Sequence, residues 1–193
     1  MKTVPLLESY DWEKMDRVVV LSPHLDDAVL SCAGLLRQLQ GKVSRLVITI
    51  CCGNPVTRDA FSQSPLGQGA AAQGARPRKG FVTPALRRRE DIRAMRALDV
   101  DFVHLGFLDA VDRRSPTTGD HIHRSPRQKW FRPSVEDAGH IEELFFILRR
   151  LCTGMGRMLV VSPLGIGNHI DHLITAQVAL RLPSPVRLLF YED

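Results

Sequence analysis

The chain alternates between short apolar segments and longer segments with helical signals, and this alternation limits the folds open to it. The apolar segments are continuous and rich in valine, leucine and isoleucine, as expected of strands that are buried on both faces. We predict strands at 17–22, 44–51, 101–107, 157–162 and 185–191. Strands that alternate with helices favour an α/β protein: a mostly parallel sheet with helices on both faces, in a three-layer Rossmann-like arrangement.

The predicted helices carry start and stop signals. Gly41 stands where a C-terminal cap would follow the first helix, and Thr83-Pro84 opens the second with an N-cap residue and a proline. Ser134 and Asp137 resemble a capping box before the third. The predicted helices cover 27–40, Thr83 to about residue 98, the segment behind 134–137, and 171–182.

Two further patterns shape the fold prediction. The third helix has one apolar face, formed by Ile141, Leu144, Phe145, Leu148 and Cys152. The segments 53–82 and 109–133 lack apolar periodicity, and loops of this length inside a compact domain are either functional or disordered.

The composition is that of a globular protein, and we expect one domain over residues 1–193. The chain is 44% hydrophobic and 24% charged. No stretch approaches the roughly 20 apolar residues of a membrane span. The first residues lack a signal-peptide core, so a cytoplasmic location is expected. Cys32, Cys51, Cys52 and Cys152 match neither a redox pair nor a zinc ribbon, so we expect buried, reduced thiols.

The formal net charge of +5 raises the question of a nucleic-acid partner. The excess of arginine lies mainly in 76–96 and 113–132, and neither stretch interleaves aromatic with basic residues as single-strand binders do. We therefore expect surface or substrate-pocket arginines and no nucleic-acid partner.

Two short polar motifs follow directly on predicted strands. The first is His24-Leu25-Asp26-Asp27, after segment 17–22, and the second is His169-Ile170-Asp171-His172, after segment 157–162. In a parallel sheet both strand ends lie at the carboxyl edge, where ligands bind. The chain has no G-x-G-x-x-G after its first strand and no P-loop, which excludes a dinucleotide or nucleotide-phosphate site of those types.

The residue types in these motifs suit a catalytic metal site. Such a zinc site uses three protein ligands and leaves a position for water. Two histidines and one carboxylate would complete it, leaving one carboxylate and one histidine for proton transfer. Either motif alone also fits a helix cap or a surface histidine, and it is their occurrence together at one edge that favours the site.

The pattern S-P-H-x-D-D with a later H-x-D-H resembles the PIG-L/LmbE-like zinc-dependent N-deacetylases. Those enzymes act on amino sugars in cell-surface anchors, thiol cofactors and glycosylated natural products. The resemblance runs from about residue 17 to residue 193. It includes Arg-Arg-Arg-Glu at 87–90, Leu-Gly-Phe-Leu-Asp at 105–109 and the closing Phe-Tyr-Glu-Asp.

The resemblance implies a division of labour between the two motifs. It makes His24, Asp27 and His172 the ligands of Zn²⁺, with Fe²⁺ and Co²⁺ as alternatives that suit the same donors. It makes Asp26 the general base for the water that attacks the amide. His169 then stabilises the tetrahedral oxyanion and protonates the departing amine.

Four other residues take supporting roles in the same resemblance. Asp171 orients a histidine by accepting its other ring proton. Arg87, Arg88 and Asp109 stand where the family contacts the sugar hydroxyls.

The function implied is a metal-dependent hydrolase that removes an N-acetyl or other N-acyl group from an amino sugar, such as an N-acetylglucosamine conjugate, by zinc-activated water. The alternative is a family member that binds a glycan or partner through the retained metal site without turnover. Leu25 and Ala28 depart from the commonest family residues, proline and glutamate. The chain also stops at its fifth predicted strand, whereas relatives usually continue into further pocket-forming elements, which leaves open whether part of the acceptor pocket is missing or unusual. An oligomer has no support in the sequence.

The remaining histidines are interpreted as structural. His104 lies within an apolar strand and is expected in the core. His121 and His123 lie in the long polar segment and are expected to be exposed, and His140 begins a helix face.

Overall fold

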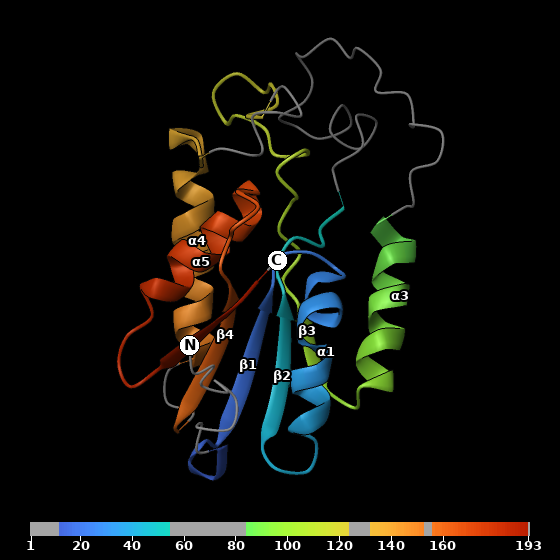
Figure 1. The fold of residues 1–193 in the computed structure, drawn as a ribbon. Coiled ribbons are helices and arrows are strands. Elements are labelled where there is room, and N and C mark those ends of the chain that lie inside the picture. Colours follow the sequence, from blue (N-terminus) through green and yellow to red (C-terminus); the bar gives the residue numbers. More distant parts are fainter. Residues whose placement is uncertain (1–11, 55–83, 124–131, 153–155, 193) are drawn as a thin grey trace, which may run out of the picture.

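The computed structural model describes residues 12–54, 84–123, 132–152 and 156–192. These residues form one five-stranded sheet in the order β3-β2-β1-β4-β5, and every pairing in it is parallel (Figure 1). The strands are β1 (Arg17–Ser22), β2 (Ser44–Thr49), β3 (Asp101–His104), β4 (Met158–Pro163) and β5 (Arg187–Tyr191). The predicted α/β fold with a mostly parallel sheet is confirmed.

Helices cover both faces of this sheet, as predicted. The helices are η1 (Trp12–Lys14), α1 (Asp27–Gln38), α3 (Pro84–Ala97), η3 (Val135–Asp137), α4 (Ala138–Cys152) and α5 (Ile170–Leu180). Helices α1 and α3 lie on one face, and α4 and α5 on the other (Figure 1). Two hydrophobic cores result, one for each face.

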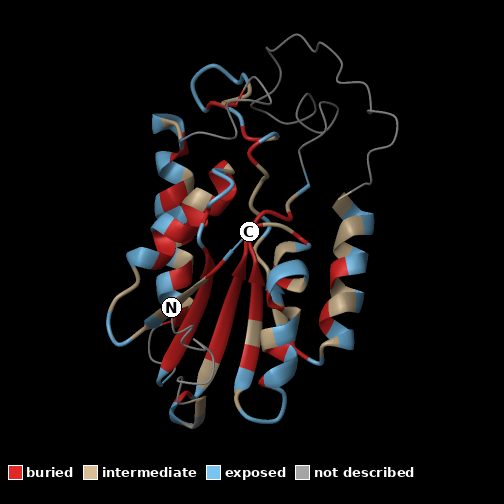
Figure 2. Ribbon diagram, in the orientation of Figure 1, coloured by how far each residue is buried: buried red, intermediate tan, exposed pale blue. Residues whose placement is uncertain are grey.

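Alternate residues of the central strands supply the two cores. Val19 and Val160 pack under α4 and α5, while Val20 and Val161 pack under α1 and α3. All four are at most 1% exposed. Figure 2 shows the central strands buried along most of their length. A strand that is buried on both faces requires a continuous apolar run, which is the pattern in the sequence.

The chain reverses its direction across the sheet between β1 and β4. From β1 it proceeds outward to β2 and β3, then crosses back to β4, which pairs with β1 in the register Val20 to Val161. Such a switch point opens a crevice at the carboxyl ends of the two strands, because the loops that leave them run to opposite faces. Both polar motifs emerge at this crevice.

The capping signals read from the sequence are largely confirmed. Ser134 and Asp137 form a capping box, and Gly41 has a φ of 75° after α1. Thr83 lies outside the described residues. The third strand ends at His104 rather than at residue 107, because Gly106 takes a left-handed φ of 79° that a strand does not accommodate.

The four cysteines are free and buried, as predicted. Within the described ranges, no helix is long and apolar enough to cross a membrane.

Candidate metal centre

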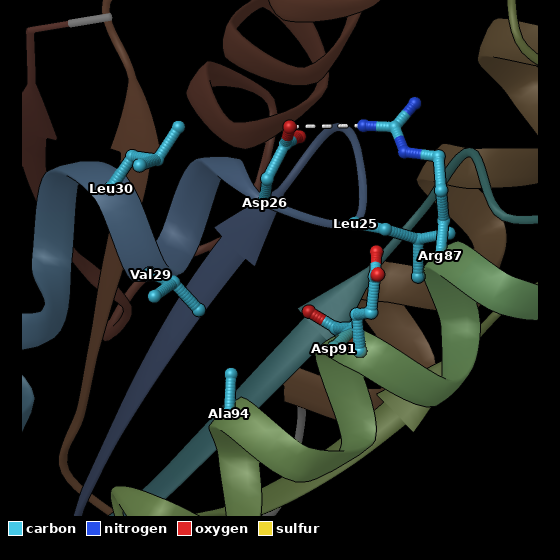
Figure 3. A pocket seen from close by; sticks show the side chains of 8 residues that line it. Leu25, Asp26, Val29, Leu30, Arg87, Asp91 and Ala94 are labelled. Carbon is cyan, nitrogen blue, oxygen red and sulfur yellow. Dashed lines mark hydrogen bonds and ion pairs between the residues drawn. The ribbon is translucent and has the colours of Figure 1, made fainter. Parts of the chain in front are cut away.

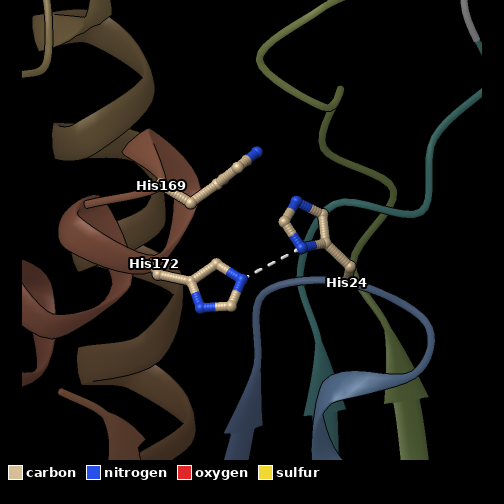
Figure 4. Close-up of side chains that lie close together, drawn as sticks. All are labelled: His24, His169 and His172. Carbon is tan, nitrogen blue, oxygen red and sulfur yellow. Dashed lines mark hydrogen bonds between the residues drawn. The ribbon is translucent and has the colours of Figure 1, made fainter. Parts of the chain in front are cut away.

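The loop after β1 and the start of α5 bring three histidines together. His24 comes from the first, and His169 and His172 come from the second, so residues 148 positions apart in the chain become neighbours (Figure 4). The His24 ring lies edge-on to His169 at 4.8 Å and tilted to His172 at 5.1 Å between ring centroids. These three residues form a group with potential ligand atoms within 4.8 Å of one another.

The ligand atoms predicted for zinc lie at almost equal separations. His24 Nδ1 is 3.2 Å from Asp27 Oδ2 and 3.2 Å from His172 Nε2, and His172 Nε2 is 3.4 Å from Asp27 Oδ2. Neighbouring ligands of a tetrahedral zinc with bonds of 2.0–2.1 Å lie about 3.3 Å apart. The donor set of two imidazoles and one carboxylate, and its spacing, therefore fit a divalent metal such as zinc.

A tight turn between β1 and α1 presents His24 and Asp27 on the same side. The Ser22 hydroxyl donates to the His24 carbonyl at 2.6 Å and accepts from the Ala28 amide at 3.0 Å. The His24 amide donates to Asp27 Oδ2 at 2.7 Å. These contacts close the turn at the point where the chain enters α1, and thus bring two residues three positions apart to a common point.

A second group of potential ligands shares His24. It adds Asp109, His169 and Asp171 and lies against Nε2, the other nitrogen of the His24 ring. Nε2 is 3.1 Å from Asp171 Oδ2 and 3.7 Å from Asp109 Oδ2. Asp171 is also held by Arg113 and by the Ala110 amide. This second group is therefore less available to a metal than the set of His24, Asp27 and His172.

The Asp171 carboxylate is buried and ionised beneath the centre. Its Oδ1 contacts Arg113 Nη1, and its Oδ2 accepts from the Ala110 amide at 3.0 Å. Although burial raises the pKa of Asp171, contacts with His24 and the charge of Arg113 hold it well below its usual value. A carboxylate in this position orients a histidine ring through the nitrogen that faces away from the metal.

The electrostatics of the crevice favour a cation between two carboxylates. Burial alone would lower the pKa of His24, but Asp171 and Asp27 outweigh burial and raise it to about 10. Burial also opposes ionisation of Asp27, yet contacts with His24 hold its pKa below the usual value. The two carboxylates therefore favour a positive charge at this point of the crevice, which is also a condition for binding a divalent metal.

His169 and His172 are neutral in the same field. Burial and the charge of His24 lower the pKa of His169 to about 4. For His172, burial is the largest cause of a lowered pKa. His169 caps α5: its Nδ1 accepts from the Asp171 amide at 3.3 Å. This contact assigns the ring proton to Nε2, which leaves a neutral donor.

Asp26 faces away from the ligand atoms. Its Oδ2 is 2.9 Å from Arg87 Nη2, and both side chains are half exposed, at 51% and 41%. The pair lies in a pocket between α1 and α3 that is also lined by Leu25, Val29, Leu30, Glu90, Asp91 and Ala94 (Figure 3). Asp26 therefore stands between this pocket and the metal centre.

The other two predicted substrate residues differ in their surroundings. Asp109 is 31% exposed near His24, with its Oδ1 accepting from the Val111 amide. Arg88 is turned inward and donates to the Cys52 carbonyl, which fastens the start of α3 to the end of β2.

Two expectations for residues near the site are wrong. Arg113 lies in one of the basic stretches assigned to surface or substrate-pocket arginines, but it is buried between Asp171 and Asp137. His123 was expected to be exposed, but it is buried, with Nε2 3.1 Å from Asp137 Oδ2. His104 pairs with Asp91 at 2.7 Å, which agrees with a structural role. Among the sequence signals discussed above, only the capping box at Asp137 lies in this group of buried charged residues.

The chain is similar to known proteins in sequence and in fold. Residues 19–182 match the PIG-L family, described as GlcNAc-PI de-N-acetylase. The chain belongs to the PIG-L family. A 2'-N-acetylparomamine deacetylase of Streptomyces fradiae is 27% identical over 188 residues, which cover 92% of this chain and 56% of that protein.

Two solved structures of PIG-L-like deacetylases resemble the chain as well. A deacetylase–teicoplanin complex from the teicoplanin pathway has a TM-score of 0.60 and 31% identity, over 85% of this chain and 64% of that one. The zinc-inhibited form of a teicoplanin deacetylase has a TM-score of 0.63 and 29% identity, over 91% and 67% of the two chains. The chain thus spans little more than half of the length of the Streptomyces fradiae relative, at 56%. That residues 1–193 form a single domain stays a prediction.

Proposed function

We propose that this PIG-L protein is a metal-dependent hydrolase that removes an N-acetyl group from an amino sugar or an amino-sugar conjugate. The observation that carries the proposal is the convergence of His24, Asp27 and His172, whose ligand atoms lie 3.2–3.4 Å apart. The similarity to a 2'-N-acetylparomamine deacetylase and to a deacetylase in complex with teicoplanin supports an amino-sugar substrate.

His24, Asp27 and His172 would hold the metal. When bound, a divalent metal lowers the pKa of water and polarises an amide carbonyl. Zinc is the first choice for two imidazoles and one carboxylate, and Fe²⁺ and Co²⁺ suit the same donors. A related teicoplanin deacetylase has been solved in a zinc-inhibited form. The amount of zinc should therefore be controlled in any assay of this protein.

Asp26 is the general base in this proposal. It follows His24 by two residues and precedes the ligand Asp27, so its carboxylate can reach the centre by a change of rotamer. Its ion pair with Arg87 is half exposed and contributes at most about 1 kcal/mol, which a bound substrate can replace. Once free of Arg87, Asp26 accepts a proton from the attacking water and passes it to the departing amine.

His169 is the oxyanion donor in this proposal. Its Nδ1 is engaged by the Asp171 amide, so its Nε2 carries the proton and donates it in a hydrogen bond. A pKa lowered to about 4 keeps the ring neutral near pH 7. A neutral ring suits hydrogen-bond donation better than transfer of a proton to the amine, which favours Asp26 for that second task.

Arg87 and Asp109 are the proposed contacts to the sugar. Arg87 lies on the first turn of α3, next to Asp26, and Asp109 lies on the loop after β3, near His24. Both carry part-exposed side chains near the crevice. Arg88 already donates to the Cys52 carbonyl, so in this proposal it supports the start of α3 rather than contacting the sugar.

Acetate release tests the function directly. The full chain, stripped with a chelator and then given one equivalent of Zn²⁺, Co²⁺ or Fe²⁺, is incubated with N-acetylglucosamine and with 2'-N-acetylparomamine. We expect acetate to appear only with metal, and less of it with excess Zn²⁺. Release that persists in chelator would contradict metal dependence. Metal-dependent sugar binding without acetate would support the alternative, a glycan-binding protein that has kept the site.

A further inference from the structure

A buried arginine bridges two carboxylates behind the metal centre. Arg113 Nη1 contacts Asp171 Oδ1, and Arg113 Nε lies 2.9 Å from Asp137 Oδ1. The side chains are 5% exposed for Arg113, 1% for Asp171 and 0% for Asp137. Within the described residues, Nε and Nη2 of Arg113 make no hydrogen bond, so Asp137 holds the guanidinium by charge, and removal of either carboxylate would leave a buried charge poorly paired.

On the side of the centre, the bridge immobilises Asp171. Arg113 holds one carboxylate oxygen, while the other accepts from the Ala110 amide at 3.0 Å and lies 3.1 Å from His24 Nε2. The carboxylate therefore cannot rotate away from the histidine without losing its contact with Arg113 Nη1. In a His24 ring that binds a metal, the proton would be held on Nε2 by Asp171, which would leave Nδ1, facing Asp27 and His172, for the metal.

On the far side, the bridge is anchored to the start of α4. Asp137 Oδ2 accepts from the Ser134 amide at 2.7 Å, closing the capping box, and lies 3.1 Å from His123 Nε2. Because Asp137 belongs to a helix start that packs in the core, its position is set by the fold rather than by the loop that carries Arg113.

We propose that Arg113 is a positioning residue for the metal centre: held by Asp137, it fixes Asp171, and through Asp171 it sets the orientation of the His24 ring. This inference rests on the proposed metal site. Residues that orient a metal-binding histidine usually change metal affinity by about 10–100-fold. The role depends on the planar fork of arginine, which meets two carboxylates at once, whereas a lysine ammonium is a single point of charge.

The test measures metal affinity in the absence of substrate. Zn²⁺ binding to the full chain is followed by competition with a chromophoric chelator, and the visible spectrum of bound Co²⁺ reports the ligand geometry. We expect Arg113→Lys to bind Zn²⁺ about 10–100-fold more weakly and to shift the Co²⁺ spectrum. Arg114→Lys is the matched control, since Arg114 is exposed and donates to the Gly119 carbonyl. Affinity within twofold of the unmodified protein in Arg113→Lys would overturn the proposal.

A double-mutant cycle separates positioning from general stability. If Arg113 acts through Asp171, Arg113→Lys has little further effect on Zn²⁺ affinity in an Asp171→Asn background. A loss of the same size in both backgrounds would show that Arg113 acts by another route and would reject the proposal. The measurement uses no substrate. Its outcome is therefore the same whether or not the protein proves to be a deacetylase.

Asp137→Asn provides a second variant if Arg113→Lys does not fold. Asparagine keeps the shape and an acceptor for Ser134 but removes the charge that holds Arg113. We expect Zn²⁺ affinity to fall about three- to tenfold, less than in a variant that changes Arg113 itself. Unchanged affinity in a folded Asp137→Asn protein would contradict the proposed anchor.

Discussion

Helices α5 and α3 both border the site, yet they are attached to the protein in different ways. In α5, eight of eleven residues are buried, whereas in α3 only Asp91 and Met95 of fourteen residues are. Figure 2 shows this contrast along the two helices. Since α5 begins inside the core, its first turn holds His169, Asp171 and His172 in place.

The attachment of α3 combines Met95, which is buried in the core beneath α1, with polar contacts. Asp91 pairs with His104 at 2.7 Å, and Arg88 donates to the Cys52 carbonyl. Arg87, on the exposed first turn, reaches Asp26 through a half-exposed ion pair. The difference teaches that the helix carrying the proposed ligand His172 is packed into the core, while the helix carrying the proposed sugar contact Arg87 is held by few buried residues. Three substitutions test this division.

The largest effect is expected on the α5 side. His172→Ala removes one of three proposed ligands from a buried position, so Zn²⁺ affinity should fall by more than the roughly 100-fold upper limit seen for residues that only orient a ligand. Acetate release should be lost with it. Chelator competition on the folded variant provides the measurement, and a variant that still binds one Zn²⁺ at the affinity of the unmodified protein would reject the ligand set.

Asp26→Asn should separate chemistry from metal binding. Because Asp26 faces Arg87 rather than the ligand atoms, Zn²⁺ affinity should stay within about threefold, while loss of a general base should lower kcat by about 10²–10⁴-fold. Glu90→Gln is the matched control, an exposed acid in the same pocket, and should keep kcat. Equal losses of metal and turnover in Asp26→Asn would contradict the assignment of the base.

The smallest effect is expected on the α3 side. Arg87→Met breaks the exposed ion pair with Asp26, so the free energy of unfolding should change by less than about 1 kcal/mol. Loss of a sugar contact should lower kcat/KM by about tenfold, mainly through KM, because uniform binding is removed. Arg89→Met, an exposed neighbour on α3, serves as the control. A fall in kcat with KM unchanged would place Arg87 in the chemistry and end the contrast between the two helices.

Much of the fold could be predicted because its signals are local. The strand at 17–22 and the helix that begins at Asp27 agree with β1 and α1, since a buried parallel strand and a capped helix each leave a pattern within a few residues. The third strand was predicted too long, because the run of apolar residues through Phe107 does not reveal the left-handed Gly106 within it.

The environment of the site could not be predicted in the same way. Arg113 and Asp171 are 58 positions apart, and nothing in the basic stretch around Arg113 marks this residue as buried. His123 was taken as exposed because its neighbours are polar, yet Asp137 gives it a buried partner. The ion pair between Asp26 and Arg87, which are 61 positions apart, was likewise not indicated by any local sequence pattern.

By itself, the sequence determined the α/β class, the carboxyl edge as the place of the site, and the two motifs that meet there. Those features follow from periodicity and strand ends, which are properties of short windows of chain. Only the tertiary structure decided which nitrogen of His24 faces Asp27 and His172, which carboxylate lies behind it, and which arginine holds that carboxylate. Such choices depend on charges that are buried together, and burial is a property of the closed sheet and its helices rather than of any one segment.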